Sequence, residues 1–316
     1  MRSVLVTGSA GFIGGNFVQC FKKRFPKVKI IGLDDFSSGR RDRVTKDQIF
    51  YEGSIRDARL LRKIFTRHRP DYVFHFAAIP RVSYSVEQPV HTSEVNIIGT
   101  LVLLSVARDF GVKRFIYSSS SSVYGGAKKL PTKEIDNEPN PRSPYAAQKL
   151  SGEYFMKIWS DLFDLDTISL RYFNVFGPGQ YGDSPYSTVI SAWLETLYFN
   201  KRKPFVEGDG NQSRDFCYVD NVVEANISAM RSKKDFKGEV FNIAHNERIT
   251  VNEVRRLIVK YTGRRLALEK RPPRKGDVRH THGDILKAKR WFGYQPKVGF
   301  EEGLRRTVAW FEKRIR

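Results

Sequence analysis

The chain has 316 residues, of which 40% are apolar, and a formal net charge of +21. This length and apolar content suffice for one large core or two smaller ones. Only two cysteines and no run of 18 apolar residues occur, which argues against a disulfide framework and against insertion into a membrane. The N-terminal apolar stretch is too short for a secretory signal, so a cytoplasmic protein is expected. The positive charges are scattered along the chain, which is more typical of a solvated surface than of a nucleic-acid site.

Short apolar runs alternate with helical patterns through the first half of the chain. We expect helices near 12–24, 57–67, 93–109 and 143–163, and strands at Ser3–Thr7, Lys29–Leu33, Gln48–Tyr51, Tyr72–Phe76, Arg114–Tyr117 and Thr167–Arg171. This alternation predicts an α/β fold with a doubly wound parallel sheet, whose ligands bind at the carboxyl ends of the strands. From about residue 176 Gly, Pro and Tyr become frequent and the strands shorten. We therefore predict a first domain at 1–175 and a smaller α/β domain at 176–316, some segments of which return to the first.

The first strand is followed by a glycine-rich turn in VLVTGSAGFIGG. Gly8, Gly11 and Gly14 allow a tight turn and a close approach of backbone N–H groups to a diphosphate, at the positive end of a helix. Asp34 ends the next strand about twenty positions later, where a carboxylate suits the two ribose hydroxyls of an adenosine. Its charge would repel a 2′-phosphate, so NAD is favoured over NADP, although Arg40-Arg41 leaves NADP open.

A tyrosine and a lysine stand four residues apart in SPYAAQKLSGEYF. On a helix, Tyr145 and Lys149 would therefore share one face. A lysine cation beside a phenol favours the phenolate, so we expect a lowered pKa for Tyr145, which a bound nicotinamide cation would lower further. Such a tyrosine can take a proton from a sugar hydroxyl.

Five consecutive serines occupy 118–122 in FIYSSSSSVYGG. A serine run alone is typical of a flexible spacer. Here the preceding residues, Arg114–Tyr117, have the pattern of a parallel strand, so the serines fall at its carboxyl end. A serine at that place can hydrogen-bond a reacting oxygen, and we favour this interpretation over the spacer.

Together these motifs resemble the extended short-chain dehydrogenase/reductase family, in its NAD-dependent nucleotide-sugar epimerase/dehydratase branch. The resemblance extends over essentially the whole chain, with the pieces TGSAGFIG, LDDFSSG, HFAA, SSSVYG, SPYAAQK, RYFNVFGPGQ, GDGNQSRDFCYVDN and GDVRH. It implies a Rossmann-type domain that binds NAD and a smaller domain that binds a nucleoside-diphosphate sugar. By analogy with the family, a homodimer would form through the helices near 93–109 and 146–163.

The resemblance also assigns site residues. It implies Ser120, Tyr145 and Lys149 as catalytic residues, with Tyr145 as the base. The implied cofactor-binding residues are Gly8, Gly11, Phe12, Ile13, Gly14, Asp34, Ser38, Gly39, Ser54, Ile55, Phe76, Ala77, Ala78, Asn96, Ser118, Tyr145, Lys149 and Tyr172. The implied substrate-binding residues are Ser83, Ser120, Ser121, Ser122, Tyr145, Asn174, Val189, Arg214, Arg274, Asp277 and Thr281.

The serine run also points to one reaction within the family. Family members that eliminate water carry an aspartate and a glutamate where this chain has Ser121 and Ser122. A hydroxyl does not replace a carboxyl group as acid or base, so 4-epimerisation is expected. In that reaction Tyr145 takes the proton of O4 and hydride passes from C4 to the nicotinamide. The resulting 4-keto sugar then turns over and is reduced on the opposite face.

The sugar is assigned from one position. A tyrosine in the loop after Gly-Asp excludes N-acetyl groups in this family, and alignment of GDVRHTHGD places the small Thr281 there. We expect interconversion of UDP-GlcNAc and UDP-GalNAc, with weaker activity on UDP-Glc and UDP-Gal, in polysaccharide precursor synthesis. UDP-glucuronate is the alternative sugar. A non-catalytic NAD-binding or RNA-binding relative is an alternative of a different class.

Three features depart from the family pattern or compete with it. Ser54 stands where relatives have an aspartate that contacts adenine, which leaves that contact in doubt. His280 and His282 form a His-x-His pair, yet no third ligand is apparent and we expect no metal. His75 is interpreted as a packed histidine rather than a base.

Overall fold

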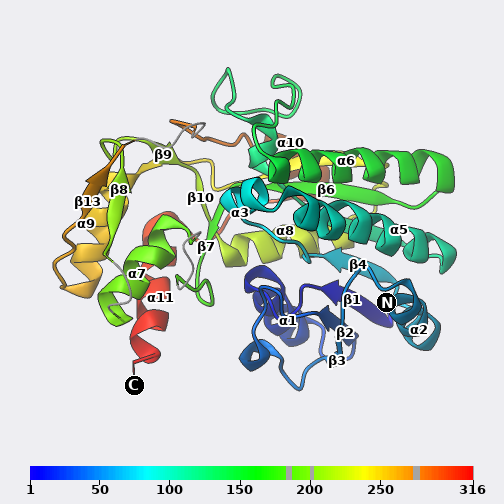
Figure 1. The fold of residues 1–316 in the computed structure, drawn as a ribbon. Helices are drawn as coiled ribbons and strands as arrows, with labels where there is room; N and C mark the ends of the chain where they lie inside the picture. The colour runs from blue at the N-terminus through cyan, green and yellow to red at the C-terminus, as the bar shows by residue number, and fades with distance from the viewer. Residues whose placement is uncertain (183–186, 200–202, 273–277, 316) are drawn as a thin grey trace.

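The computed structural model describes the chain except for residues 183–186, 200–202, 273–277 and 316. Its centre is a seven-stranded parallel sheet with the strand order β11-β6-β5-β4-β1-β2-β3, flanked by helices on both faces (Figure 1). The strands are β1 (Ser3–Thr7), β2 (Lys29–Asp34), β3 (Ile49–Glu52), β4 (Tyr72–His75), β5 (Arg114–Ser120), β6 (Thr167–Tyr172) and β11 (Glu239–Ile243). The predicted doubly wound Rossmann-type fold is confirmed.

Each face of the sheet carries its own apolar core. One core includes side chains of α1 (Phe12–Arg24), α8 (Val219–Arg231) and α10 (Leu286–Phe292). The other includes side chains of α2 (Ala58–His68), α5 (Thr100–Asp109) and α6 (Pro144–Phe163). All five residues of β1 are buried, as expected of a strand that is covered on both faces.

The helix before β5 is continuous over Pro89–Asp109. It consists of α4 (Pro89–Ser93), a π-helical segment (Glu94–Gly99) and α5, and α3 (Val82–Glu87) precedes it. By length and composition it is apolar enough to cross a membrane, and half of its most apolar stretch is buried inside the protein. A core helix meets the same criterion, because burial against a sheet and burial in lipid both require apolar side chains.

Two strands of the central sheet depart from the prediction by more than one residue at either end. β5 runs on through Ser118, Ser119 and Ser120, so these serines belong to the sheet and the spacer alternative is excluded. β11 was not among the predicted strands. It pairs with β6 from Glu239↔Ile168 to Ile243↔Tyr172 and brings a segment from beyond residue 176 into the central sheet.

The remaining elements form a smaller unit beside the carboxyl ends of the strands. Three two-stranded ribbons pair β7 with β10, β9 with β12, and β8 with β13. A third apolar core joins them to helices α7, α9 and α11. The bounds are β7 (Asn174–Phe176), α7 (Val189–Phe199), β8 (Phe205–Glu207), β9 (Ser213–Arg214), β10 (Phe216–Tyr218), β12 (Ile249–Thr250), α9 (Val251–Thr262), β13 (Glu269–Arg271) and α11 (Phe300–Lys313).

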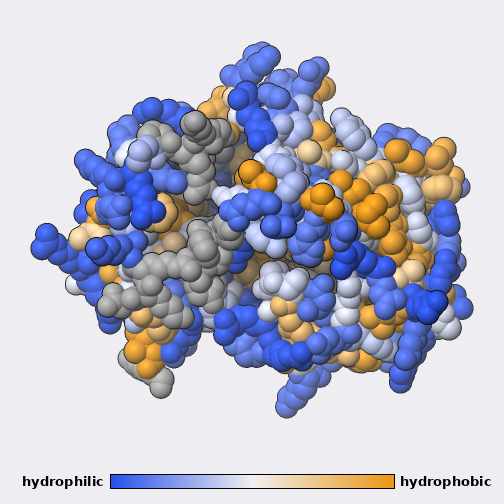
Figure 2. Space-filling view, in the orientation of Figure 1, coloured by the Kyte–Doolittle hydropathy of each residue, from blue (hydrophilic) through white to orange (hydrophobic). Residues whose placement is uncertain are grey.

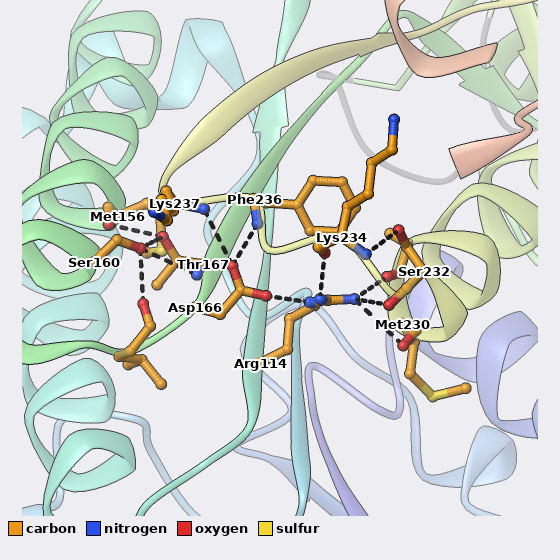
Figure 3. A network of polar contacts seen from close by, with 12 residues as sticks. Arg114, Met156, Ser160, Asp166, Thr167, Met230, Ser232, Lys234, Phe236 and Lys237 are labelled. Carbon is orange, nitrogen blue, oxygen red and sulfur yellow. Dashed lines mark hydrogen bonds and ion pairs between the residues drawn. The ribbon is translucent and has the colours of Figure 1, made fainter. Parts of the chain in front are cut away.

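A buried ion pair anchors the connection between α8 and β11 at the amino ends of β5 and β6 (Figure 3). Arg114 donates to the carboxylate of Asp166 at 2.5 Å and to the backbone oxygens of Ala229 and Lys234. Asp166 in turn accepts from the backbone N–H of Phe236 at 2.6 Å. This network fixes the segment that leads into β11, at the end of the sheet opposite to the predicted site.

Candidate active site

A cavity of about 570 Å³ lies at the carboxyl ends of the strands. It is bordered by the segments that follow β1, β2, β3 and β4, by the end of β5, by Tyr145 of α6, and by residues at and after the end of β6. Most of the predicted cofactor-binding residues line it, namely Gly8, Gly11, Phe12, Ile13, Gly14, Asp34, Ser38, Gly39, Ile55, Phe76, Ala77, Ala78, Tyr145 and Tyr172. The sheet therefore gathers residues from six separate segments of the sequence at one place.

The glycine-rich turn leaves the positive end of α1 open to the cavity. Gly8 has a φ of +69°, and a Cβ on it would lie 2.7 Å from the backbone nitrogen of Ala77. A Cβ on Gly14 would clash with the carbonyl oxygen of Gly8. Gly11, the N-cap of α1, has no side chain that could cap the first N–H groups. These N–H groups are therefore available to a diphosphate.

Asp34 ends β2 with a buried carboxylate. One oxygen accepts from the N–H of Ala10 at 2.9 Å and the other from the N–H of Phe36 at 2.8 Å. Burial raises the pKa of Asp34, whereas these backbone hydrogen bonds lower it. A Cβ on Gly39 would lie 2.5 Å from the carboxylate, so a glycine is needed there. Asp34 is thus held rigidly at the predicted place for the adenosine ribose.

Tyr145 and Lys149 lie on the face of α6 that packs against β5. Lys149 Nζ donates to the carbonyl oxygen of Ser118 at 2.7 Å and lies 5.9 Å from the centre of the Tyr145 ring. Burial lowers the pKa of Lys149 to about 7, and the charge of Glu153 opposes this effect. Lys149 can therefore gain or lose a proton near neutral pH, close to the phenol of Tyr145.

We expected a lowered pKa for Tyr145, and for the protein without bound cofactor this prediction is wrong. Burial raises the pKa of Tyr145 to about 12, and only a hydrogen bond with Ser120 lowers it. The ammonium of Lys149 is committed to the Ser118 carbonyl rather than to the phenol. The sequence pattern gives the spacing of the two residues, but not the desolvation that outweighs the lysine charge.

The five serines have different roles. Ser118 Oγ lies 3.1 Å from the hydroxyl of Tyr172, and Ser119 Oγ donates to Glu153 at 2.5 Å. Ser120 borders the cavity, and its Oγ accepts from the N–H of Ser122 at 3.2 Å. Ser121 and Ser122 begin a 3₁₀ turn, Ser121–Tyr124, and are absent from the cavity lining. Of the serines, Ser120 is thus the one placed beside Tyr145.

Sequence reasoning missed a buried ion pair behind these residues. Glu153, 3% exposed at its side chain, accepts from Arg171 in a bidentate pair of 2.8 and 2.6 Å, and also from Ser119. Glu153 stands four residues after Lys149, on the same face of α6. The signal was available in the sequence as Tyr-x₃-Lys-x₃-Glu, but only the fold shows that the carboxylate is buried.

Four of the predicted cofactor-binding residues support the cavity from behind, without lining it. Asn96 accepts from the N–H of Ile79 at 2.8 Å and donates to Gln148 at 2.7 Å, which fixes the segment after β4. Ser54 accepts from the N–H of Arg56 at 3.3 Å. Ser118 and Lys149 are joined by the hydrogen bond from Lys149 Nζ to the Ser118 carbonyl oxygen. Ser54 as an adenine contact stays a prediction.

A second cavity, of about 270 Å³, lies in the smaller unit and shares lining residues with the first. Three predicted substrate-binding residues, Asn174, Val189 and Arg214, border it. Its other walls include the apolar Trp193, Phe205 and Phe216. A cavity that combines an arginine and an amide with aromatic walls suits a nucleoside diphosphate.

Thr281 and Asp215 connect the loops around this second cavity. Thr281 Oγ1 accepts from the N–H of Asp215 at 3.1 Å and donates to Asn174 Oδ1 at 3.4 Å. Asp215, fully buried, accepts from the N–H groups of His245 and Gly283. Burial raises its pKa to about 7. Thr281 lines neither cavity, and Ser83, on α3, also lies outside both linings.

Two predicted substrate contacts, Arg274 and Asp277, lie outside the described residues. His280 is bonded to Ser213 at 2.8 Å rather than paired with His282. Within the described part of the chain, no group of three or more His, Cys, Asp or Glu side chains could hold a metal ion. His75 is buried between Thr7 and Thr100, and burial lowers its pKa to about 3, which agrees with a packed histidine.

Known proteins share this fold over their whole length. The model of the NAD-dependent epimerase/dehydratase family matches residues 4–244. UDP-glucose 4-epimerase of Thermotoga maritima, solved with UDP-glucose, has a TM-score of 0.94 and 39% identity, with both chains fully covered. UDP-N-acetylglucosamine 4-epimerase of Methanobrevibacter ruminantium, in complex with UDP-N-acetylmuramic acid, has a TM-score of 0.91 and 36% identity over 99% of each chain. UDP-glucuronate 4-epimerase of Thermodesulfobacterium geofontis is 33% identical over 327 residues, 100% of this chain and 98% of its own.

The chain belongs to the NAD-dependent epimerase/dehydratase family. The predicted family, cofactor and class of enzyme, a UDP-sugar 4-epimerase that uses NAD, are confirmed at this level. The three relatives act on different sugars, so they leave the sugar of this chain open.

Proposed function

We propose that the protein interconverts UDP-GlcNAc and UDP-GalNAc by 4-epimerisation, with weaker activity on UDP-Glc and UDP-Gal. The observation that carries the choice of epimerisation is the set of acidic residues around the cavity. Among the described residues, only Asp34 and Asp35 bring carboxylates to its lining. Both lie at the carboxyl end of β2, which β1 and β4 separate from β5, so they lie about 14 Å from the Ser120 side at the usual strand spacing. Elimination of water would need a carboxyl group beside Tyr145.

The chain's own residues would act in a fixed arrangement. Tyr145 holds or accepts the proton of the sugar O4, and Ser120 hydrogen-bonds the same oxygen and the phenol. Lys149, fixed by the Ser118 carbonyl, would bring its charge near the phenol and would bind a ribose hydroxyl of the cofactor. Bound NAD would supply the acceptor and the donor of hydride. Asn174 and Arg214 retain the diphosphate while the sugar turns over.

The preference for acetylated sugars rests on the small side chain of Thr281. Its hydroxyl is occupied by Asp215 and Asn174, so only the methyl group of its side chain is left without a hydrogen-bonding role. A tyrosine at this position would add a ring beside Asn174, a proposed diphosphate contact. The Methanobrevibacter relative, which bears the name of an acetylated sugar, supports the choice.

The test is incubation of the purified protein with UDP-GlcNAc, UDP-Glc or UDP-glucuronate, without added NAD, and resolution of the products by NMR. Formation of UDP-GalNAc is expected to be fastest. Thr281→Tyr should abolish turnover of the acetylated pair while UDP-Glc turnover persists, and Thr281→Ser serves as the matched control. Unchanged turnover of UDP-GlcNAc by Thr281→Tyr would overturn the gate assignment. Turnover of UDP-glucuronate alone would replace the proposed substrate.

UDP-glucuronate is the second candidate substrate, because an arginine lies in the wall of the first cavity. Arg81, in the segment between β4 and α3, lines the first cavity together with Tyr145 and Ser120. A guanidinium in that place could pair with the C6 carboxylate of a uronate. Arg81→Met should then abolish activity on UDP-glucuronate but leave activity on UDP-Glc, whereas equal effects on both sugars would exclude a carboxylate contact.

We also propose that two copies associate through the continuous helix Pro89–Asp109, which includes α5, and through α6. Apolar side chains are exposed there, including Ile98 at 51%, Tyr154 at 59% and Leu162 at 70%. Figure 2 shows orange surface over the region where Figure 1 places these helices. Leu162→Asp should convert a dimer to a monomer in light scattering. Ile135→Asp, at the exposed Ile135 on a separate loop, is the control. A wild-type monomer would exclude the proposal.

A further inference from the structure

We propose that Arg43 is a cofactor-binding residue, whose guanidinium adds a positive charge to the site that holds the diphosphate of NAD. Arg43 ends a 3₁₀ turn, Arg41–Arg43, that follows β2. It lines the first cavity together with Gly11, Gly14 and Gly39. The proposal rests on the family's cofactor and is independent of which sugar is turned over.

Two glycines make room for this side chain beside α1. A Cβ on Gly15, in the second turn of α1, would lie 2.9 Å from Arg43 Nε. A Cβ on Gly179, in the loop after β7, would clash with the guanidinium. The Arg43 guanidinium thus lies between α1 and a loop of the smaller unit, on the wall of the cavity where the N–H groups of α1 are open.

In the described part of the chain, no carboxylate forms an ion pair with Arg43, although the charge of the neighbouring Asp42 acts on it. In this part of the chain, the guanidinium donates one hydrogen bond, to the carbonyl oxygen of Gly179 at 2.5 Å. Its neighbours in the same turn differ, because Arg41 forms a bidentate pair with Glu52 and Arg40 lies 3.5 Å from Asp42. Burial lowers the pKa of Arg43, and the charges of Tyr181 and Asp42 oppose this effect only in part.

An anion would resolve this electrostatic conflict. A cation beside the positive end of a helix is unfavourable unless a negative group lies between them. The diphosphate of a dinucleotide carries two negative charges and binds at that helix end. A guanidinium can donate two parallel hydrogen bonds to it.

The competing interpretation is that Arg43 only ties the loop after β7 to α1. That loop has a second tie, since Asn16 of α1 donates to the carbonyl oxygen of Pro178 at 3.0 Å. Removal of Arg43 should therefore leave the loop attached. A loss of affinity that depends on the phosphates of the ligand would separate the two interpretations.

The experiment measures binding rather than turnover. Cofactor-depleted wild type, Arg43→Met and Arg43→Lys are titrated calorimetrically with NAD, ADP and adenosine, and the NAD retained through purification is quantified. Arg43→Met should weaken NAD and ADP by about tenfold or more, as expected of a lost hydrogen bond between charged groups, and leave adenosine within about twofold. Arg43→Lys should lose less, because it keeps the charge.

Arg41→Met is the matched control, since Arg41 lies in the same turn with its side chain 71% exposed. It should bind all three ligands like the wild type. ADP binding by Arg43→Met within about twofold of the wild type would overturn the proposal, and so would an equal loss for ADP and adenosine. If Arg43→Met does not fold, Arg43→Gln replaces it under the same criteria. If the protein does not turn over UDP-GlcNAc but Arg43→Met still loses affinity for NAD and ADP as expected, only the proposed substrate is rejected.

Discussion

Two buried arginine–carboxylate pairs lie at opposite ends of the neighbouring strands β5 and β6. At the amino ends Arg114 pairs with Asp166, and at the carboxyl ends Arg171 pairs with Glu153. The first pair holds backbone groups of the α8–β11 connection. The second holds Ser119 and lies one helical turn from Lys149. The same chemistry therefore stabilises the fold at one end and supports the site at the other, and position along the strand decides which.

The largest expected effect is on stability, at the amino ends. Arg114→Met removes the ion pair with Asp166 and four hydrogen bonds to backbone oxygens of the surrounding chain. Removal of one partner of a buried ion pair typically costs about 3–5 kcal/mol of unfolding free energy. Urea unfolding should show this loss, while the pH profile of kcat keeps its shape in the folded variant. A shifted pH profile would break the comparison, since this pair would then influence the site.

Glu153→Gln tests the other end. We expect a loss of stability of about 3 kcal/mol, because glutamine can still accept one hydrogen bond from Arg171 or Ser119 but leaves the guanidinium charge unpaired. In addition, the carboxylate charge that raises the pKa of Lys149 is lost. The lysine then releases its proton at a lower pH.

The sign of the pH effect follows from the protonated form being the active one. Activity that depends on charged Lys149 falls as the pH rises through its pKa, which burial places near 7. In Glu153→Gln this fall should begin at a lower pH than in the wild type. Arg114→Met provides the control for reduced stability alone. A profile in Glu153→Gln that coincides with the wild type would show that Glu153 is only structural.

The sequence predicted the elements that follow local patterns. β1 and α1 lie at the predicted residues, because an apolar run, three glycines and an amphipathic helix occur together. β11 was missed because EVFNI gains its role only from pairing with β6, far away in the sequence. Glu153 and Arg171 were missed because a charged side chain is read as exposed until the fold buries it. The prediction of a lowered pKa for Tyr145 failed for the same reason, because the burial that raises this pKa is a property of the fold.

Ser120→Ala should have a smaller effect, confined to catalysis. The hydrogen bond with Ser120 is the interaction that lowers the pKa of Tyr145 against its burial. Its loss should reduce kcat by about tenfold, near 1.4 kcal/mol, and shift the activity to higher pH. Ser118→Ala is the matched control, because its hydroxyl contacts Tyr172 instead. Equal loss of kcat in both variants would mean that the strand end, rather than the Ser120 hydroxyl, matters.

The smallest effects compare one serine at each end of the strands. Ser160 Oγ donates to Leu165 O at 2.7 Å beside the amino-end pair, and Ser119 Oγ donates to Glu153 at 2.5 Å within the carboxyl-end pair. Ser119→Ala loses one hydrogen bond, or roughly 1 kcal/mol of unfolding free energy. Ser160→Ala loses in addition the hydrogen bonds of its hydroxyl with the N–H and Oγ1 of Thr167, so its loss of stability should be somewhat larger. Arg171 still holds Glu153 in Ser119→Ala, so the carboxylate keeps its charge and the pH profile of kcat should stay unchanged. A shift in Ser119→Ala that matches the one in Glu153→Gln would mean that the orientation of the carboxylate, and not only its charge, controls Lys149.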